Sequence, residues 1–83
     1  MQISILTPEK EVYSGAVKSI KVPGITGQFE ILDNHAAIVS ALGRGQVRLI
    51  TDDGQTVLYD IAKGFIEVLN NEVALLVQGL KSV

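Results

Sequence analysis

The chain has 83 residues, with 7 Lys and Arg against 9 Asp and Glu, a net charge of −2 and no cysteine. This length is typical of a single domain. The lack of cysteine excludes a disulfide framework and a thiolate zinc site. The acidic balance and an aromatic content of 5% argue against nucleic-acid binding. No apolar run approaches the ~20 residues that span a bilayer, and the N-terminus lacks the regions of a signal peptide.

The first quarter of the chain indicates strands joined by a tight turn. Apolar and polar residues alternate over Gln2–Thr7, and Thr7-Pro8-Glu9-Lys10 is typical of a turn. The stretch Glu11–Val22 is rich in β-branched residues, but its valines and isoleucine do not share one face at period 2. Either a β-bulge near Ser14-Gly15 or Lys18-Ser19 corrects the register, or two shorter strands meet at a bend at Gly15.

The middle of the chain alternates sharp turns with short apolar segments. Pro23-Gly24 predicts a turn, because Pro fixes φ and Gly accepts positive φ, and a short strand is expected over Phe29–Leu32. Asp33-Asn34 tolerates left-handed geometry. The only helix candidate is Asn34–Leu42, but its sequence and the glycine break after it fit an extended segment as well, and we expect a strand.

The remainder of the chain indicates strands separated by turns rich in Gly, Asn and Asp. Gly54 is expected to adopt positive φ in a hairpin loop, and Asn70-Asn71 suits a two-residue type I′ turn. The expected segments, in chain order, are strand Gln46–Thr51, loop Asp52–Gln55, strand Thr56–Ala62, turn Lys63-Gly64, strand Phe65–Leu69, turn Asn70-Asn71 and strand Glu72–Gln78.

About eight short strands with no helix predict an all-β fold. We expect a small two-sheet β-sandwich, or flattened barrel, of short antiparallel strands, forming a single domain over residues 1–83. Linkers, internal repeats and low-complexity segments are absent from the sequence.

Four blocks of sequence, in order, resemble the N-terminal β-sandwich domain of the epsilon subunit of the rotary ATP synthase. The blocks are Tyr13-Ser14-Gly15 with Val17 and Ile20-Lys21-Val22; Pro23-Gly24-Ile25-Thr26-Gly27-Gln28-Phe29; Asn34-His35-Ala36 with Ile38-Val39, Gly45 and Val47-Arg48; and Lys63-Gly64-Phe65-Ile66-Glu67-Val68 with Val73 to Val77. Together they cover nearly the whole chain.

The sequence departs from the family in three places. The family usually has Pro-Gly before the histidine and Pro two residues after it, where this chain has Asp33-Asn34 and Ala37. Gln28 stands where the family often has an acidic residue that contacts the c-ring. Glu30 is therefore expected to contribute more to that contact. Family members commonly continue into a C-terminal helical hairpin, whereas this sequence stops at Val83. Either the subunit is naturally short or the sequence is truncated; we expect the natural short form, without a C-terminal helical domain.

The resemblance implies a non-catalytic rotor subunit at the foot of the central stalk, which joins the gamma subunit to the c-ring and couples rotation to ATP synthesis. It implies no cofactor or metal, and a peripheral place at the cytoplasmic face of the inner (plasma) membrane, with membrane contact only through the complex. The residues expected to face the c-ring are Gly24, Ile25, Thr26, Gly27, Gln28, Glu30 and His35. Those expected to face gamma are Ala36, Ile38, Val39 and Ser40, with the outward parity of this segment left open.

Other interpretations of single residues carry less weight. His35 is the sole histidine, and Asp33 with His35 supplies only two of the three or four ligands of a zinc site, so a structural role is expected. Gly43-Arg44-Gly45 lacks the Lys-Ser/Thr ending of a phosphate loop, and Asp52-Asp53-Gly54 lacks the other ligands of a calcium loop. The alternative functions are a biotinyl- or lipoyl-type carrier domain modified at Lys63, or another β-sandwich interaction module.

Overall fold

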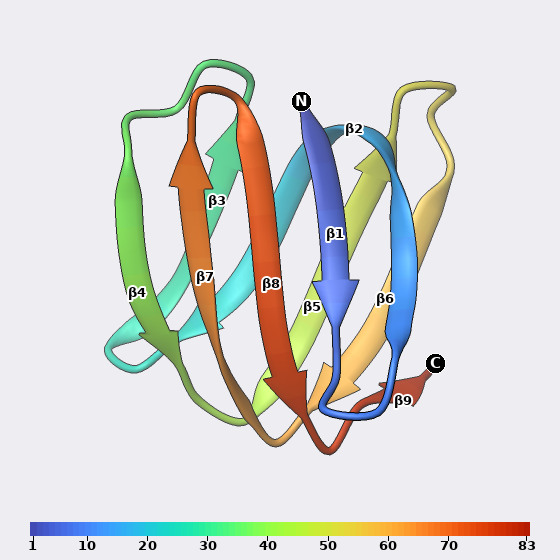
Figure 1. The fold of residues 1–83 in the computed structure, drawn as a ribbon, viewed down its shortest axis with the longest axis vertical. Helices are drawn as coiled ribbons and strands as arrows, with labels where there is room; N and C mark the ends of the chain where they lie inside the picture. Colours follow the sequence, from blue (N-terminus) through green and yellow to red (C-terminus); the bar gives the residue numbers. More distant parts are fainter.

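The computed structural model describes residues 1–83 and contains nine strands and no helix (Figure 1). The expected all-β class is therefore confirmed. The strands are β1 (Gln2–Leu6), β2 (Glu11–Gly24), β3 (Gly27–Leu32), β4 (Ile38–Leu42), β5 (Gly45–Thr51), β6 (Thr56–Ile61), β7 (Lys63–Leu69), β8 (Glu72–Gln78) and β9 (Lys81–Ser82).

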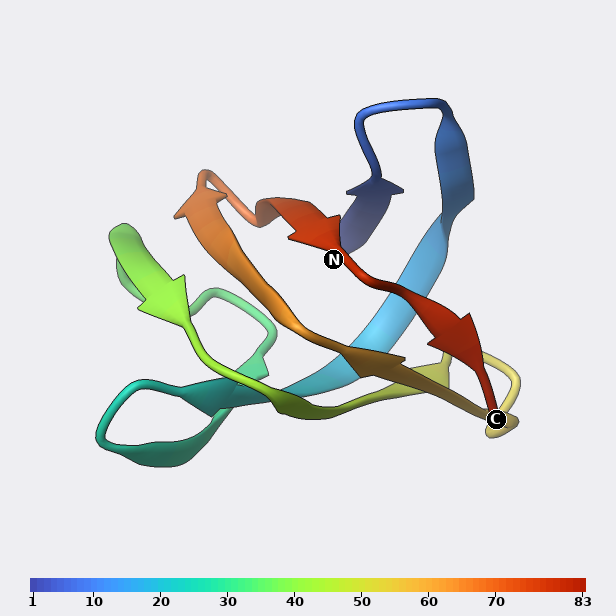
Figure 2. The same ribbon diagram turned by 90° about the horizontal axis from the view of Figure 1, so that it is seen from below.

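The strands form two layers that share the long strand β2. One layer has the order β1-β8-β7-β4, and the other has the order β3-β2-β5-β6-β9. β2 also pairs with β1 along its first half, so the sheet folds back on itself, and Figure 2 shows the two layers facing each other. All pairs are antiparallel except β1 with β8, which run parallel.

β2 resolves the open question in the N-terminal segment. It runs unbroken through Gly15, so two shorter strands with a bend at that residue are wrong. Its pairing with β5 shifts register between Val17 and Ser19, which confirms a bulge at the second of the two expected places. The extra residue changes the parity of the strand, so Val17, Ile20 and Val22 are all buried.

The core consists of the inward positions of both layers. Sixteen hydrophobic side chains are buried there, and Ile20, Leu49, Ile66 and Leu75 are among those with no exposed surface. Alternation along each strand leaves the intervening residues on the outer faces. The chemistry of the surface is therefore set by these outward positions and by the turns.

The middle segment is extended rather than helical, as expected, although the strand begins only at Ile38. The turn expected at Lys63-Gly64 lies one residue earlier, at Ala62, and both residues belong to β7. The last strand, β9, was not expected.

The turns gather at the two ends of the sandwich (Figure 1). One end carries the connections β1–β2, β2–β3, β4–β5, β6–β7 and β8–β9, and we call it the Arg44 end. The opposite end carries the N-terminus and the connections β3–β4, β5–β6 and β7–β8.

Candidate functional site

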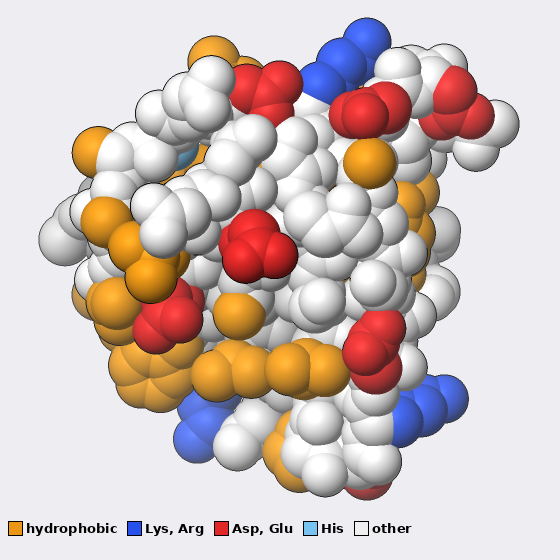
Figure 3. Space-filling model, turned by 45° about the horizontal axis from the view of Figure 1, so that its top comes forward, with side chains coloured by type: hydrophobic (Ala, Val, Ile, Leu, Met, Phe, Trp, Pro, Cys, Tyr) orange, Lys and Arg blue, Asp and Glu red, His pale blue; other side chains and the backbone are white.

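The outer face of the β1-β8-β7-β4 layer carries an apolar row at right angles to the strands. Ala41 pairs with Phe65, Phe65 with Leu76, and Leu76 with Leu6, so the four side chains lie side by side on neighbouring strands. Phe65 is 57% exposed and Leu76 is 48% exposed. Figure 3 shows hydrophobic side chains as a band across this face, with basic side chains below it at the edges of the view. We call Leu6, Ala41, Phe65 and Leu76 the apolar row.

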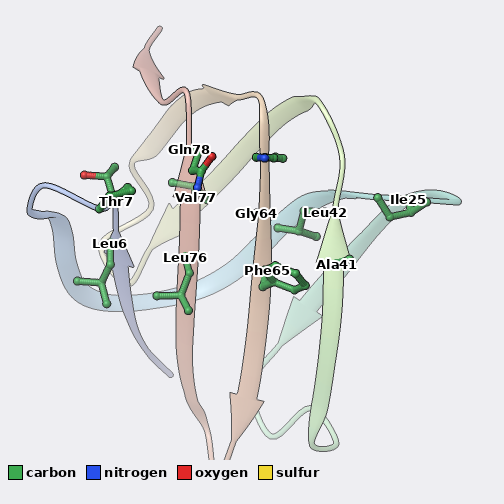
Figure 4. A pocket seen from close by; sticks show the side chains of 12 residues that line it. Leu6, Thr7, Ile25, Ala41, Leu42, Gly64, Phe65, Leu76, Val77 and Gln78 are labelled. Atoms are coloured by element: carbon green, nitrogen blue, oxygen red, sulfur yellow. The ribbon is translucent and has the colours of Figure 1, made fainter.

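A groove of about 620 Å³ follows this row toward the Arg44 end. Its walls include the apolar row and Pro8. Figure 4 shows Leu6 at one end of the groove and Ile25 at the other. Gly64 lies in the groove where β7 approaches β8 closely: a Cβ at this position would lie 2.5 Å from the carbonyl oxygen of Leu76. The groove is therefore mainly apolar, open to solvent, and shaped by a residue without a side chain.

The β2–β3 hairpin places Ile25 at the tip of a tight turn. Gly24 and Gly27 face each other across the hairpin, and a Cβ on Gly24 would lie 2.6 Å from the Gly27 carbonyl oxygen. Gly27 has φ 142°, which disfavours any other residue. Ile25 is 67% exposed. Five residues expected to face the c-ring thus come together here: Gly24, Ile25, Thr26, Gly27 and Gln28.

Glu30 is engaged by its own neighbours on the outer face of the other layer. Its Oε2 accepts a hydrogen bond from the buried Ser19 hydroxyl at 2.5 Å and another from Nη2 of Arg48 at 3.3 Å. Glu30, which was expected to contact the c-ring, is therefore already paired within the domain. The turn of the β2–β3 hairpin carries no acidic side chain.

His35 lies at the opposite end of β3 from the Ile25 turn (Figure 1). Its backbone NH closes the β3–β4 turn on the Leu32 carbonyl at 3.1 Å, and its Nδ1 lies 2.7 Å from the Ala36 carbonyl, to which an Nδ1–H donates. These bonds give the histidine a structural part in the turn. No group of three or more His, Cys, Asp or Glu is arranged to hold a metal. The structure does not bring His35 together with the other residues of its expected surface.

The β3–β4 turn is anchored to two other parts of the chain. Asn34 has φ 62°, and its backbone NH donates to the side-chain oxygen of Asn71 at 2.8 Å. The Met1 ammonium donates to Asp33 at 2.6 Å, and this hydrogen bond lowers the pKa of the exposed Asp33 carboxyl. Asn34 thus supplies the left-handed geometry expected of it.

The segment expected to face gamma divides between the two sides of β4. Val39 points outward and is 70% exposed, whereas Ile38 and Ser40 are half-buried on the inner side and Ala36 is exposed before the strand. The structure thus fixes the parity that the sequence left open. Sequence reasoning missed the apolar row, although one signal was present: alternation assigns Phe65 and Leu76 to the outer face, where a solvated strand would carry polar residues.

Comparison with known proteins places this geometry in a family. Residues 1–82 match the family of the ATP synthase delta/epsilon chain β-sandwich domain. The chain belongs to this family. The ATP synthase epsilon chain of Protochlamydia amoebophila is 40% identical over 81 residues, covering 98% of this chain and 55% of that protein. That of Chlorobaculum tepidum is 40% identical over 76 residues, covering 92% of this chain and 86% of that protein.

A solved structure has the same fold as this chain. A chain of the Euglena gracilis mitochondrial ATP synthase, in a structure of its OSCP, F1 and c-ring parts, superposes with a TM-score of 0.88 at 18% identity, covering 96% of this chain and 51% of that one. At this identity the likeness concerns the fold alone. This chain spans about half the length of several relatives, at 55% for the Protochlamydia protein.

The family membership confirms the resemblance seen in the sequence. The chain is similar to the epsilon chains of ATP synthase over their β-sandwich domain. This membership leaves the carrier-domain alternative at Lys63 without support. The structure itself has no helix long and apolar enough to cross a membrane.

Proposed function

We propose that this domain belongs to the central stalk of a rotary ATP synthase, where it joins the gamma subunit to the c-ring and transmits rotation between them at the cytoplasmic face of the membrane. The family supports a place in the synthase, and the Euglena gracilis chain with the same fold comes from an assembly that includes the c-ring. The domain offers two surfaces for this task, an apolar sheet face and an end built of turns.

The apolar row is the observation that carries the proposal. Specific interfaces have an apolar, often aromatic centre surrounded by a polar rim. The apolar row provides such a centre, and Val39, two residues before Ala41 on β4, extends it. Gamma is the partner that we assign to this face. Of the residues expected to face gamma, Val39 would touch it, while Ile38 and Ser40 would support the strand from inside.

The Ile25 turn is the part of the domain that we assign to the c-ring. It projects from the Arg44 end, and its backbone is confined by the close approach of Gly24 to Gly27. A confined turn keeps its shape under lateral load better than a long loop, because fewer backbone conformations are accessible to it. His35, at the opposite end, is left outside this contact.

Co-purification with gamma tests the proposal. The full chain is expressed with gamma from the same organism, and complex formation is measured by size exclusion and titration calorimetry. Leu76→Glu is expected to raise the Kd about tenfold or more, because a charge would be buried at the interface centre. Leu32→Glu is the matched control, since Leu32 is 53% exposed on the outer face of the other layer.

Unchanged folding of both variants is checked by thermal denaturation. Equal weakening by both substitutions would refute the assignment of gamma to the apolar row. A folded chain that forms no complex with folded gamma would refute the proposed function as a whole.

A further inference from the structure

Asp53 is the only aspartate or asparagine of the chain that precedes a glycine. Such a pair can rearrange without an enzyme. The backbone nitrogen of Gly54 attacks Cγ of the protonated Asp53 side chain; the N–C bond forms, the C–O bond breaks, and the hydroxyl leaves as water with the NH proton, which closes a succinimide ring. Water then opens the ring at either carbonyl carbon, and the product is aspartate or isoaspartate. Glycine favours the attack because no side chain shields its nitrogen.

The β5–β6 loop directs both reacting groups toward Thr51. The NH of Gly54 donates to the Thr51 carbonyl at 2.9 Å, and the Thr51 hydroxyl donates to the Asp53 carboxylate. The same hydroxyl oxygen accepts a hydrogen bond from the NH of Gln55 at 3.0 Å, so the Thr51 side chain is held from two sides. The bond from Thr51 also lowers the pKa of the Asp53 carboxyl, which favours the ionised form, whose oxygen is the poorer leaving group.

Hydrogen bonding, and not burial, is what this loop offers against the reaction. Asp53 and Gly54 are both exposed, so water reaches them freely. Ring closure consumes the NH of Gly54, so its bond to the Thr51 carbonyl must break first. The ends of the loop are also tied together, because the NH of Thr51 donates to the Gln55 carbonyl at 2.8 Å. Thr51 therefore holds the loop in an arrangement that differs from the one the reaction needs.

We infer that Asp53 is a site of spontaneous isomerisation to isoaspartate and that Thr51 suppresses this modification in the folded domain. Isoaspartate carries the main chain through the former side-chain carboxyl. It therefore adds one methylene to a loop whose ends, Thr51 and Gln55, are bonded to each other, and it should loosen the β5–β6 hairpin. The loop lies at the end of the sandwich opposite the Arg44 end (Figure 1). The inference is therefore independent of the surfaces assigned to gamma and the c-ring.

Uptake of a heavy oxygen isotope from labelled water tests the inference, because each hydrolysed succinimide keeps one oxygen of the water. The full chain is held at pH 6 and 37 °C, and the peptide that contains Asp53 is analysed by mass spectrometry, with isoaspartate separated from aspartate by chromatography. Folded wild type is expected to take up label at least about tenfold more slowly than the same chain unfolded in guanidinium chloride. Thr51→Val should be about five- to tenfold faster than wild type, and Thr51→Ser, which keeps the hydroxyl, within about twofold of it.

Gly64→Ala is the control for global stability. Its added Cβ crowds the Leu76 carbonyl oxygen and should destabilise the fold, but Gly64 lies toward the Arg44 end and leaves the β5–β6 loop untouched. Uptake of label in this variant should stay within about twofold of wild type. Circular dichroism verifies that each variant is folded at 37 °C, and Thr51→Ala makes the same test should Thr51→Val not fold.

Three results would overturn the inference. An unfolded chain that takes up no label at Asp53 would show that this residue is not a site of isomerisation. Equal rates in folded wild type and the unfolded chain, or in wild type and folded Thr51→Val, would show that the loop gives no protection. Equal acceleration by Thr51→Val and Gly64→Ala would assign the protection to global folding and not to Thr51.

Discussion

Gly64→Ala probes how closely β7 and β8 must approach beneath the apolar row. A Cβ at Gly64 would lie 2.5 Å from the Leu76 carbonyl oxygen and 2.9 Å from Cγ1 of Val77, so the strand backbones themselves must separate. Overpacking of this kind costs about 1–3 kcal/mol. In a domain of this size each kcal/mol lowers Tm by about 4–8 °C, so a decrease of about 5–20 °C is expected.

Thermal and urea unfolding, followed by circular dichroism, measure this effect. Gly43→Ala is the matched control, because the nearest atom to its Cβ is Cδ1 of Ile25 at 3.7 Å, an ordinary contact. That variant should stay within about 1 kcal/mol of wild type, because its Cβ makes only an ordinary contact and alanine restricts the unfolded chain. A Gly64→Ala protein as stable as Gly43→Ala would refute the close-packing argument for the groove.

Two further predictions concern the end of the sandwich opposite Arg44. The Thr51 hydroxyl donates to Asp53 and lowers the pKa of that exposed carboxyl, so its stabilisation is present above about pH 4 and is lost as the pH falls through the lowered value. Asp53→Asn should therefore flatten the loss of stability in urea titrations between pH 6 and 2, and a profile identical to that of wild type would contradict this origin. Asn70 has φ 51°, a left-handed conformation that a β-branched residue disfavours. Asn70→Val should therefore lower the free energy of unfolding by about 1–2 kcal/mol, while Asn70→Gly should stay within about 0.5 kcal/mol of wild type. Equal losses of stability in the two variants would contradict a conformational origin.

Local turn chemistry made most of the fold predictable. Asn70 and Asn71 both adopt positive φ in the β7–β8 turn, and Gly54 does so in the β5–β6 loop, as their sequences predicted. Such residues act within two or three positions of themselves, so their signal needs no tertiary context. The strands between them then follow from alternation, and the two-layer arrangement follows from their number.

Tertiary pairing decided what the sequence left open. The choice between a bulge and a bend in β2 depended on whether the strand could keep pairing past Gly15, and it pairs there with β1. The outward parity of β4 is fixed by its register with β7. β9 has only two residues and carries no periodic pattern, so it exists through its bonds to the edge of β6.

The candidate surface was harder to predict than the fold for a related reason. Ala41, Phe65, Leu76 and Leu6 come from four strands, and each is an ordinary exposed apolar residue when taken singly. Only the register of three strand pairs makes them a row. Conversely, the sequence gives no sign that Glu30 is paired. In the structure its carboxylate accepts hydrogen bonds from Ser19 and Arg48, which the bulge in β2 and the pairing of β2 with β5 bring close to it.

The size of the domain gives these surfaces more weight than they would have in a larger protein. A standard interface covers about 800 Å² on each partner, which is about one sixth of the 4785 Å² exposed here. A domain that joins two partners would therefore give about a third of its surface to them. The chain of 83 residues has a mean hydropathy of +0.34. Among its exposed apolar side chains, Phe65, Leu76 and Val39 on the sheet face and Ile25 at the turn are those that the two proposed partners would cover.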